Sequence, residues 1–131
     1  MLDLSKSGLF AGLPSKELDT IRRQLKEVTH AEGDVIMETG RPGIGFFVIA
    51  EGEAEALVPR GHTHKLGAGD HFGEIAMLDE KGRSATVKAL TPMRLGFVAE
   101  WEFKSFLTEH PEVAFRLLKS LAARLREAET N

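Results

Sequence analysis

Two side chains suited to binding a sugar phosphate lie close together within residues 69–87, GDHFGEIAMLDEKGRSATV. Glu74 has a carboxylate that accepts hydrogen bonds from hydroxyl groups. Arg83 has a planar guanidinium that suits phosphate. Gly69 and Gly73 allow tight turns, or the close approach of a ligand to the backbone. The residue types and their spacing predict a cradle for a phosphate that also carries a sugar.

The elements around these side chains are short. Residues 74–78 are good helix formers and predict a single helical turn. A helix that begins directly after a glycine points free N–H groups outward, which favours an anion. Residues 84–87 are typical of a new strand. The predicted order is therefore strand, turn, short helix, loop and strand, with Glu74 and Arg83 on either side of the loop.

This pattern resembles the phosphate-binding cassette of the cyclic nucleotide-binding domain family. The resemblance lies in Phe-Gly-Glu, a run of small apolar residues, then Arg-Ser-Ala and a β-branched pair. The family includes the catabolite activator protein, the regulatory subunits of cAMP-dependent kinase and cyclic nucleotide-gated channels. The likeness covers roughly residues 9–125. It implies a cyclic mononucleotide, cAMP or cGMP, as the ligand, with no cofactor, metal or catalytic residue.

The resemblance also implies roles for individual residues. Arg83 would pair with the cyclic phosphate, Glu74 would accept the ribose 2′-hydroxyl, and Ser84 would donate to the phosphate or the base edge. The implied ligand-binding set is Gly73, Glu74, Ile75, Ala76, Arg83, Ser84, Ala85 and Arg124. Taken singly, Arg83 also fits a surface arginine and Arg124 an exposed helix arginine. Ser84 favours cAMP, yet a hydroxyl there can also serve guanine.

Composition narrows the class of protein. A chain of 131 residues is long enough for one domain with one core. A net charge of −3 gives no support for direct nucleic-acid binding. The chain has no cysteine, and no apolar run approaches the length of a membrane span. These features predict a cytoplasmic protein, or a soluble domain of a larger one.

The chain predicts a mainly β fold flanked by helices. Leu18, Ile21 and Leu25 follow one another at helical spacing. From Val28 onward, short apolar runs alternate with turn residues, which favours an antiparallel sandwich or jelly-roll (double-stranded β-helix) barrel. We expect one cyclic nucleotide-binding domain over 1–131, with a helical segment at 1–26, the barrel at 27–98 and C-terminal helices at 99–129.

The C-terminal part predicts two helices. Trp101, Phe103, Phe106 and Leu107 fit a mostly buried helix. A second, long helix carries one apolar stripe, made of Val113, Leu117, Leu121 and Leu125. The resemblance implies that these helices move when the ligand binds. Alternatively, the stripe pairs with a second copy to form a homodimer. The regulated output domain or partner is not identified by the sequence.

Other functions fit less well. A metal-dependent cupin enzyme shares the jelly-roll architecture, and His62 and His64 form an HxH pair, but no carboxylate follows shortly after them. A hydrolase is not supported either, because the sequence shows no nucleophile with a neighbouring base. A degenerate family member without a ligand, acting as an interaction module, is the remaining alternative.

Overall fold

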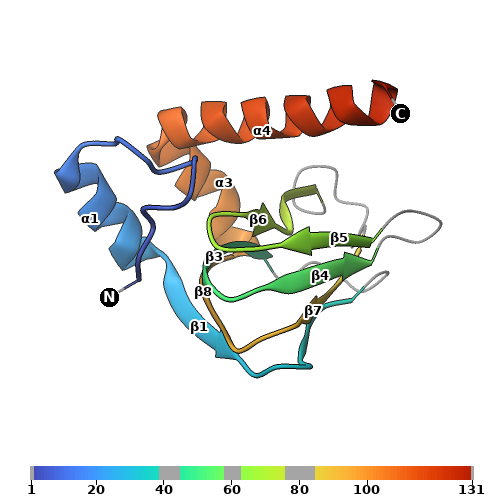
Figure 1. Cartoon of the computed structure of the whole chain (residues 1–131). Helices are drawn as coiled ribbons and strands as arrows, with labels where there is room; N and C mark the ends of the chain where they lie inside the picture. The colour runs from blue at the N-terminus through green and yellow to red at the C-terminus, as the bar shows by residue number, and fades with distance from the viewer. Residues whose placement is uncertain (1, 39–44, 58–62, 76–84, 131) are drawn as a thin grey trace.

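In the part of the chain that the structure describes, two four-stranded antiparallel sheets form the body of the protein, and three helices lie together at one side of it (Figure 1). The computed structural model describes residues 2–38, 45–57, 63–75 and 85–130. The helices are α1 (Ser15–Gln24), α3 (Glu100–Glu109) and α4 (Pro111–Thr130). The strands are β1 (Lys26–His30), β2 (Val35–Met37), β3 (Gly45–Glu51), β4 (Ala54–Leu57), β5 (Thr63–Leu66), β6 (His71–Phe72), β7 (Thr86–Ala89) and β8 (Met93–Ala99).

The strands have the order β1-β8-β3-β6 in one sheet and β2-β7-β4-β5 in the other. Every pairing is antiparallel. The mainly β, antiparallel fold with flanking helices is therefore confirmed. The closed barrel is not: the described strands form two separate sheets, and no pairing joins one sheet to the other.

Strand β3 connects the two hydrophobic cores of the molecule. Side chains alternate across a strand, so Phe47 and Ile49 pack into the core between the sheets, whereas Phe46 and Val48 pack against the helices. Both faces of β3 are thus covered, which explains its continuous apolar sequence. Such a run is typical of a central strand, and β3 indeed lies between β8 and β6.

Helix α3 buries only one of its faces. Phe103, Phe106 and His110 follow one another at helical spacing and are buried, at the end of the sheet. Trp101 lies off this face and is 84% exposed. The expectation that Trp101 is buried was therefore wrong, because hydrophobicity alone does not say which side of a helix meets the core.

Helix α4 is long and extends past the core it covers (Figure 1). Val113 and Leu117 are buried, and Leu121 packs partly against the same core. Leu125 is 62% exposed. The predicted stripe is therefore correct for its first three members and wrong for the last, which lies beyond the apolar surface of the other helices and β3.

The N-terminal segment packs beneath the first half of α4. Leu2, Leu4, Leu9 and Phe10 are all buried in the helix-side core. Arg116 of α4 donates to the carbonyl oxygens of residues 8, 9 and 11. The segment and α4 are thereby held together by both apolar contacts and hydrogen bonds. Within the described part of the chain, no helix is long and apolar enough to cross a membrane.

Candidate functional site

The site begins at a turn that only glycine tolerates. Gly73 follows β6 with a φ of +97°, a region that side chains rarely adopt. A Cβ atom there would lie 2.4 Å from the carbonyl oxygen of Gly45 on β3. The backbone therefore turns in contact with the sheet, and the next residue, Glu74, points back into the protein. The turn predicted at Gly73 is confirmed.

Glu74 is a carboxylate that is almost completely buried, with 1% of its surface exposed. Its Oε1 atom accepts a hydrogen bond of 2.7 Å from Nη1 of Arg124, on the second half of α4. His71 Nδ1 lies 3.1 Å from the same oxygen. A buried carboxylate is costly unless it is paired, so these two neighbours keep the charged form stable.

The pKa of Glu74 reflects this balance. Burial raises the pKa of the carboxyl, but the contact with His71 and the positive charge of Arg124 lower it, and the lowering effects prevail over the ordinary value of 4.5. Glu74 is therefore an anion at neutral pH. An ionised carboxylate has no proton to donate, so Glu74 acts at this site as an acceptor only.

The second carboxylate oxygen is available for a partner from outside. Oε2 of Glu74 is buried and has no hydrogen-bond partner among the described residues. Leaving such an atom unsatisfied costs about 1–3 kcal/mol or more for a charged group. A hydroxyl group that enters the site from a ligand would remove this cost, which gives the site a preference for a donor such as a sugar hydroxyl.

His71 is a site residue that sequence reasoning missed. Its ring is buried beside Phe46, and its Nε2 lies 3.0 Å from the hydroxyl of Ser120 on α4. Arg124 also reaches back to the carbonyl oxygen of His71, at 3.4 Å. The only available signal was a histidine within the cassette, and its partner Ser120 is far away in the sequence.

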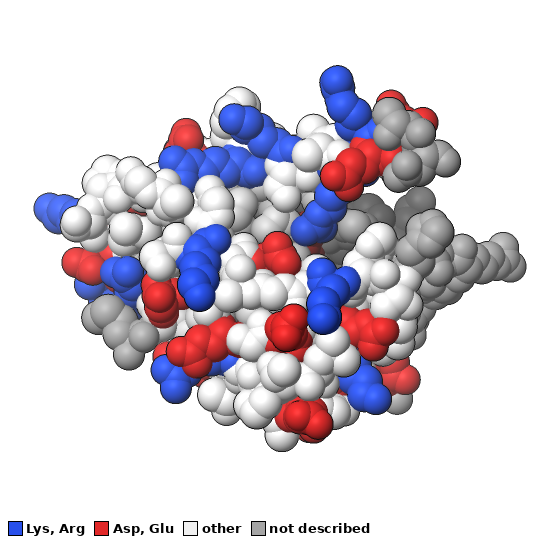
Figure 2. All heavy atoms as spheres, viewed as in Figure 1, with Lys and Arg blue, Asp and Glu red and all other residues white. Residues whose placement is uncertain are grey.

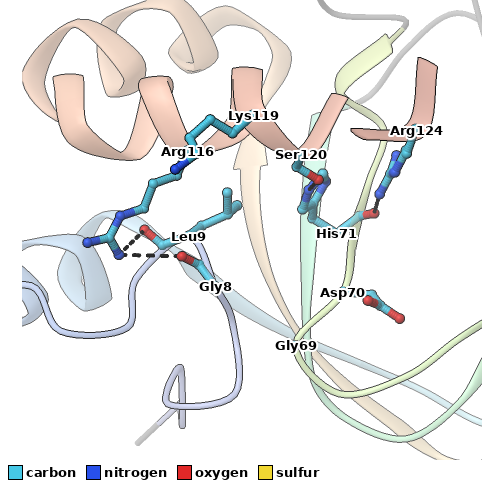
Figure 3. Close-up of a pocket in the computed structure, with 9 residues that line it drawn as sticks. All are labelled: Gly8, Leu9, Gly69, Asp70, His71, Arg116, Lys119, Ser120 and Arg124. Carbon is cyan, nitrogen blue, oxygen red and sulfur yellow. Dashed lines mark hydrogen bonds between the residues drawn. The ribbon is translucent and has the colours of Figure 1, made fainter. Parts of the chain in front are cut away.

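An open pocket of about 500 Å³ adjoins these residues (Figure 3). The N-terminal segment contributes Gly8 and Leu9 to one wall. Residues 69–71 form another wall, and Lys119 and Arg124 line the pocket from α4. His71 and Ser120 lie where these walls meet, with the two side chains pointing toward each other. The pocket therefore gives solvent a route to the buried histidine.

The structure brings only some of the predicted residues together. Gly73, Glu74 and Arg124 meet as described, although Arg124 comes from a distant helix. Ile75 follows Glu74 and is 41% exposed, whereas Ala85 is buried just before β7. Ala76, Arg83 and Ser84 lie outside the described residues.

The opposite charges on the face shown in Figure 2 are mixed. Lys and Arg side chains alternate with Asp and Glu, and no extended area of one sign covers the elements drawn there. A hollow lies below α4 on this face. The local charge at Glu74, rather than a broad field, therefore distinguishes the site.

Comparison with protein families decides the class of this domain. The model of the cyclic nucleotide-binding domain matches residues 27–110, which is more than half of the chain. The chain belongs to the cyclic nucleotide-binding domain family. The family expected from the cassette is thereby confirmed, and the matched region contains both sheets and α3.

Individual relatives agree with this assignment. A CRP-like cAMP-activated global transcriptional regulator of Mycobacterium tuberculosis is 27% identical over 133 aligned positions, covering 98% of this chain and 59% of the relative. A cAMP-dependent protein kinase regulatory subunit of Aspergillus fumigatus is 34% identical over 106 positions, covering 79% of this chain and 26% of the relative. The chain is thus similar to regulatory proteins of two kinds.

A solved structure shows the same architecture. The crystal structure of the catabolite activator protein of Thermus thermophilus superposes with a TM-score of 0.84 at 30% identity, covering 95% of this chain and 61% of that one. The chain therefore spans about three-fifths of the length of this protein and of the mycobacterial regulator.

Proposed function

We propose that this domain is a sensor that binds a cyclic mononucleotide, cAMP in preference to cGMP, and passes the binding event to its C-terminal helices. The observation that carries the proposal is the buried, unpartnered Oε2 of Glu74 beside the glycine turn. We assign to this atom the role of accepting a hydrogen bond from the ribose 2′-hydroxyl. The named relatives are cAMP-activated or cAMP-dependent regulators, which supports the same ligand class.

The remaining contacts come from the cassette. Arg83 pairs with the cyclic phosphate, and Ser84 donates to the phosphate or to the base edge. Gly73, Ile75, Ala76 and Ala85 border the phosphate and sugar with backbone groups. Arg124 reaches the site from α4, through Glu74. These assignments follow the family motif.

The expected affinity is moderate. A cyclic mononucleotide has about 22 non-hydrogen atoms, and about 0.3 kcal/mol per atom gives a binding free energy of about −7 kcal/mol, or a Kd of about 10 µM. A segment that closes over the ligand would tighten this value.

Titration calorimetry with cAMP, cGMP and 5′-AMP tests the proposal. We expect cAMP to bind more tightly than cGMP, and 5′-AMP to bind poorly because of its extra charge and open geometry. Glu74→Gln should weaken binding by removing the anionic acceptor. Arg83→Ala should weaken it by about 2–5 kcal/mol, since the phosphate loses its partner. Arg126→Ala is the matched control, because Arg126 is exposed on α4.

The titration also separates the proposal from its alternatives. If neither cyclic nucleotide binds to the folded wild-type protein, the sensor proposal is wrong and a ligand-free interaction module is the better description. Equal affinities for 5′-AMP and cAMP would contradict recognition of the cyclic phosphate. The cupin alternative depends in part on His62, which lies outside the described residues.

The output of the sensor involves the exposed side of α4. Phe115, Leu118 and Leu125 are 57%, 61% and 62% exposed, and with Ala122 they repeat at alternating steps of three and four. This spacing is typical of a two-stranded coiled coil. We therefore propose that a homodimer forms through this outer stripe.

A further inference from the structure

Resting on the proposed function, we propose that His71 is a positioning residue that links the ribose-binding carboxylate of Glu74 to helix α4 through Ser120, and that it makes nucleotide affinity depend on pH. The two ring nitrogens of His71 face different elements. Nδ1 lies 3.1 Å from Glu74 Oε1, and Nε2 lies 3.0 Å from Ser120 Oγ.

The contacts define which protons the ring carries. A carboxylate oxygen is an acceptor only, so Nδ1 must bear a proton to face it favourably. In the neutral ring, Nε2 then accepts from the Ser120 hydroxyl. When the ring is doubly protonated, Nε2 donates to Ser120 instead. Protonation therefore reverses the Ser120 hydrogen bond and places a second cation beside Glu74.

The Glu74 contact is not yet a hydrogen bond in this arrangement. Nδ1 lies 3.1 Å from Oε1, but neither Nδ1 nor Oε2 has a hydrogen-bond partner among the described residues. Both atoms are buried. A hydroxyl bound to Oε2 would reorient the carboxylate and allow Nδ1 to donate to Oε1, so ligand binding and the His71 contact are coupled through one carboxylate.

The charged groups around the ring determine the sign of the pH effect. Glu74 lies next to Nδ1, and the uncharged Ser120 lies next to Nε2. Arg124 and Lys119 line the adjoining pocket from α4, and Asp70 lines it next to His71 in the chain. Phe46 on the third side is uncharged. A cyclic nucleotide adds one negative charge to this group. A protonated His71 attracts that charge, so affinity should rise as pH falls.

Glu74 itself does not obscure this effect. Its pKa is lowered from 4.5, so the carboxylate stays ionised between pH 5.5 and 8.0. We expect the affinity of the wild-type protein for cAMP to increase about three- to tenfold between pH 8.0 and pH 5.5, which corresponds to a modest interaction between partly screened charges.

The experiment measures cAMP affinity by calorimetry from pH 5.5 to 8.0 in three variants and the wild type. His71→Phe keeps an aromatic ring but removes both nitrogens. His71→Gln keeps a polar side chain that cannot ionise, and it replaces His71→Phe in the experiment if that variant does not fold. Both should lose the pH dependence. His110→Gln is the matched control, since His110 is also buried but contacts Glu17 and Gln24 instead of the site.

A second readout tests the link to α4. Hydrogen exchange of residues 118–127 should slow when cAMP binds to the wild-type protein. In Ser120→Ala and His71→Phe this change should shrink, although cAMP still binds at saturating concentration. A merely structural role for His71 would alter melting temperature without removing the pH dependence.

The outcomes separate this inference from the proposed function. If the wild-type protein binds no cyclic nucleotide at any pH, the proposed function itself fails. If it binds cAMP but the His71 variants keep the wild-type pH dependence, only the role of His71 is overturned. Loss of the pH dependence in His110→Gln, with its retention in His71→Gln, would also overturn it.

Discussion

The two halves of α4 are held in very different ways. The first half packs Val113 and Leu117 into the core and binds the N-terminal segment through Arg116. The second half, after Leu121, is exposed through residue 129, and Arg124 donates from it to Glu74 and to the carbonyl oxygen of His71. One helix therefore combines a buried first half with an exposed end that contacts the buried carboxylate of Glu74 through Arg124.

This difference indicates which part of α4 can move at the lower cost in free energy. Moving the buried first half of α4 would cost several kcal/mol, because it would expose apolar surface to water. Moving the exposed end of α4 requires only that the Arg124–Glu74 ion pair be replaced by other contacts. Under the proposed function, a ligand that binds Oε2 of Glu74 would act through the Arg124 contact at Oε1 on the part of α4 that is easiest to move.

The contrast is strongest for the core contact of the first half. Leu117→Ala should lower the free energy of unfolding by about 2–5 kcal/mol, because it leaves a cavity under the helix. Urea unfolding followed by circular dichroism measures this value. Leu125→Ala is the matched change on the exposed end of α4. Equal losses of unfolding free energy in the two variants would contradict the proposed difference between the two halves of the helix.

The ion pair of the second half should have the next largest effect. Arg124→Ala leaves the buried Glu74 without its closest cation, and we expect a loss of about 1–2 kcal/mol at pH 7, less than for a fully buried pair because Arg124 is 44% exposed. In Arg124→Ala, hydrogen exchange of residues 122–130 should become faster, because this segment loses its contact with Glu74. Arg126→Ala should leave that exchange rate unchanged.

The same pair predicts a dependence of stability on pH. The folded-state pKa of Glu74 is lowered, so its ionisation stabilises the fold above 4.5, and this stabilisation is lost as pH falls through the folded pKa. Arg124→Ala raises that pKa, so acid unfolding should begin at a higher pH than in the wild type. An unchanged acid transition would show that Arg124 does not support the charge.

A smaller effect is expected at the clamp on the N-terminal segment. Arg116→Ala removes donors to backbone carbonyls and should cost about 1 kcal/mol, since each net hydrogen bond contributes little. Hydrogen exchange of residues 4–13 should accelerate. Lys119→Ala is the control, because Lys119 lies on the next turn of the same helix and its Nζ lies 5.9 Å from the centre of the Phe115 ring.

The smallest effect on stability should come from the outer stripe. Leu118→Glu changes an exposed position, so the melting temperature at low protein concentration should change by less than the equivalent of about 0.5 kcal/mol. Sedimentation should nevertheless show weaker self-association if the stripe forms a dimer. A dimer of unchanged strength would place the contact elsewhere.

Much of the site could be read from the sequence because its physics is local. A glycine before Glu74 and an arginine shortly after it predict a turn and two charges whatever surrounds them. The family match confirms the family, and the positive φ of Gly73 confirms the turn, whereas Arg83 lies outside the described residues. The apolar run of β3 and the short strands were also predictable, since side-chain alternation and turn residues act over a few positions.

The tertiary structure alone decided which distant groups meet. Arg124 and Ser120 reach the cassette because α4 crosses the sheet at one particular angle, and no local pattern fixes that angle. Two apolar stripes overlap on α4, one ending in Leu121 and one containing Leu125, and only packing against the core chooses between them. Sequence thus determined the chemistry of the carboxylate and its turn, while long-range packing determined its partners.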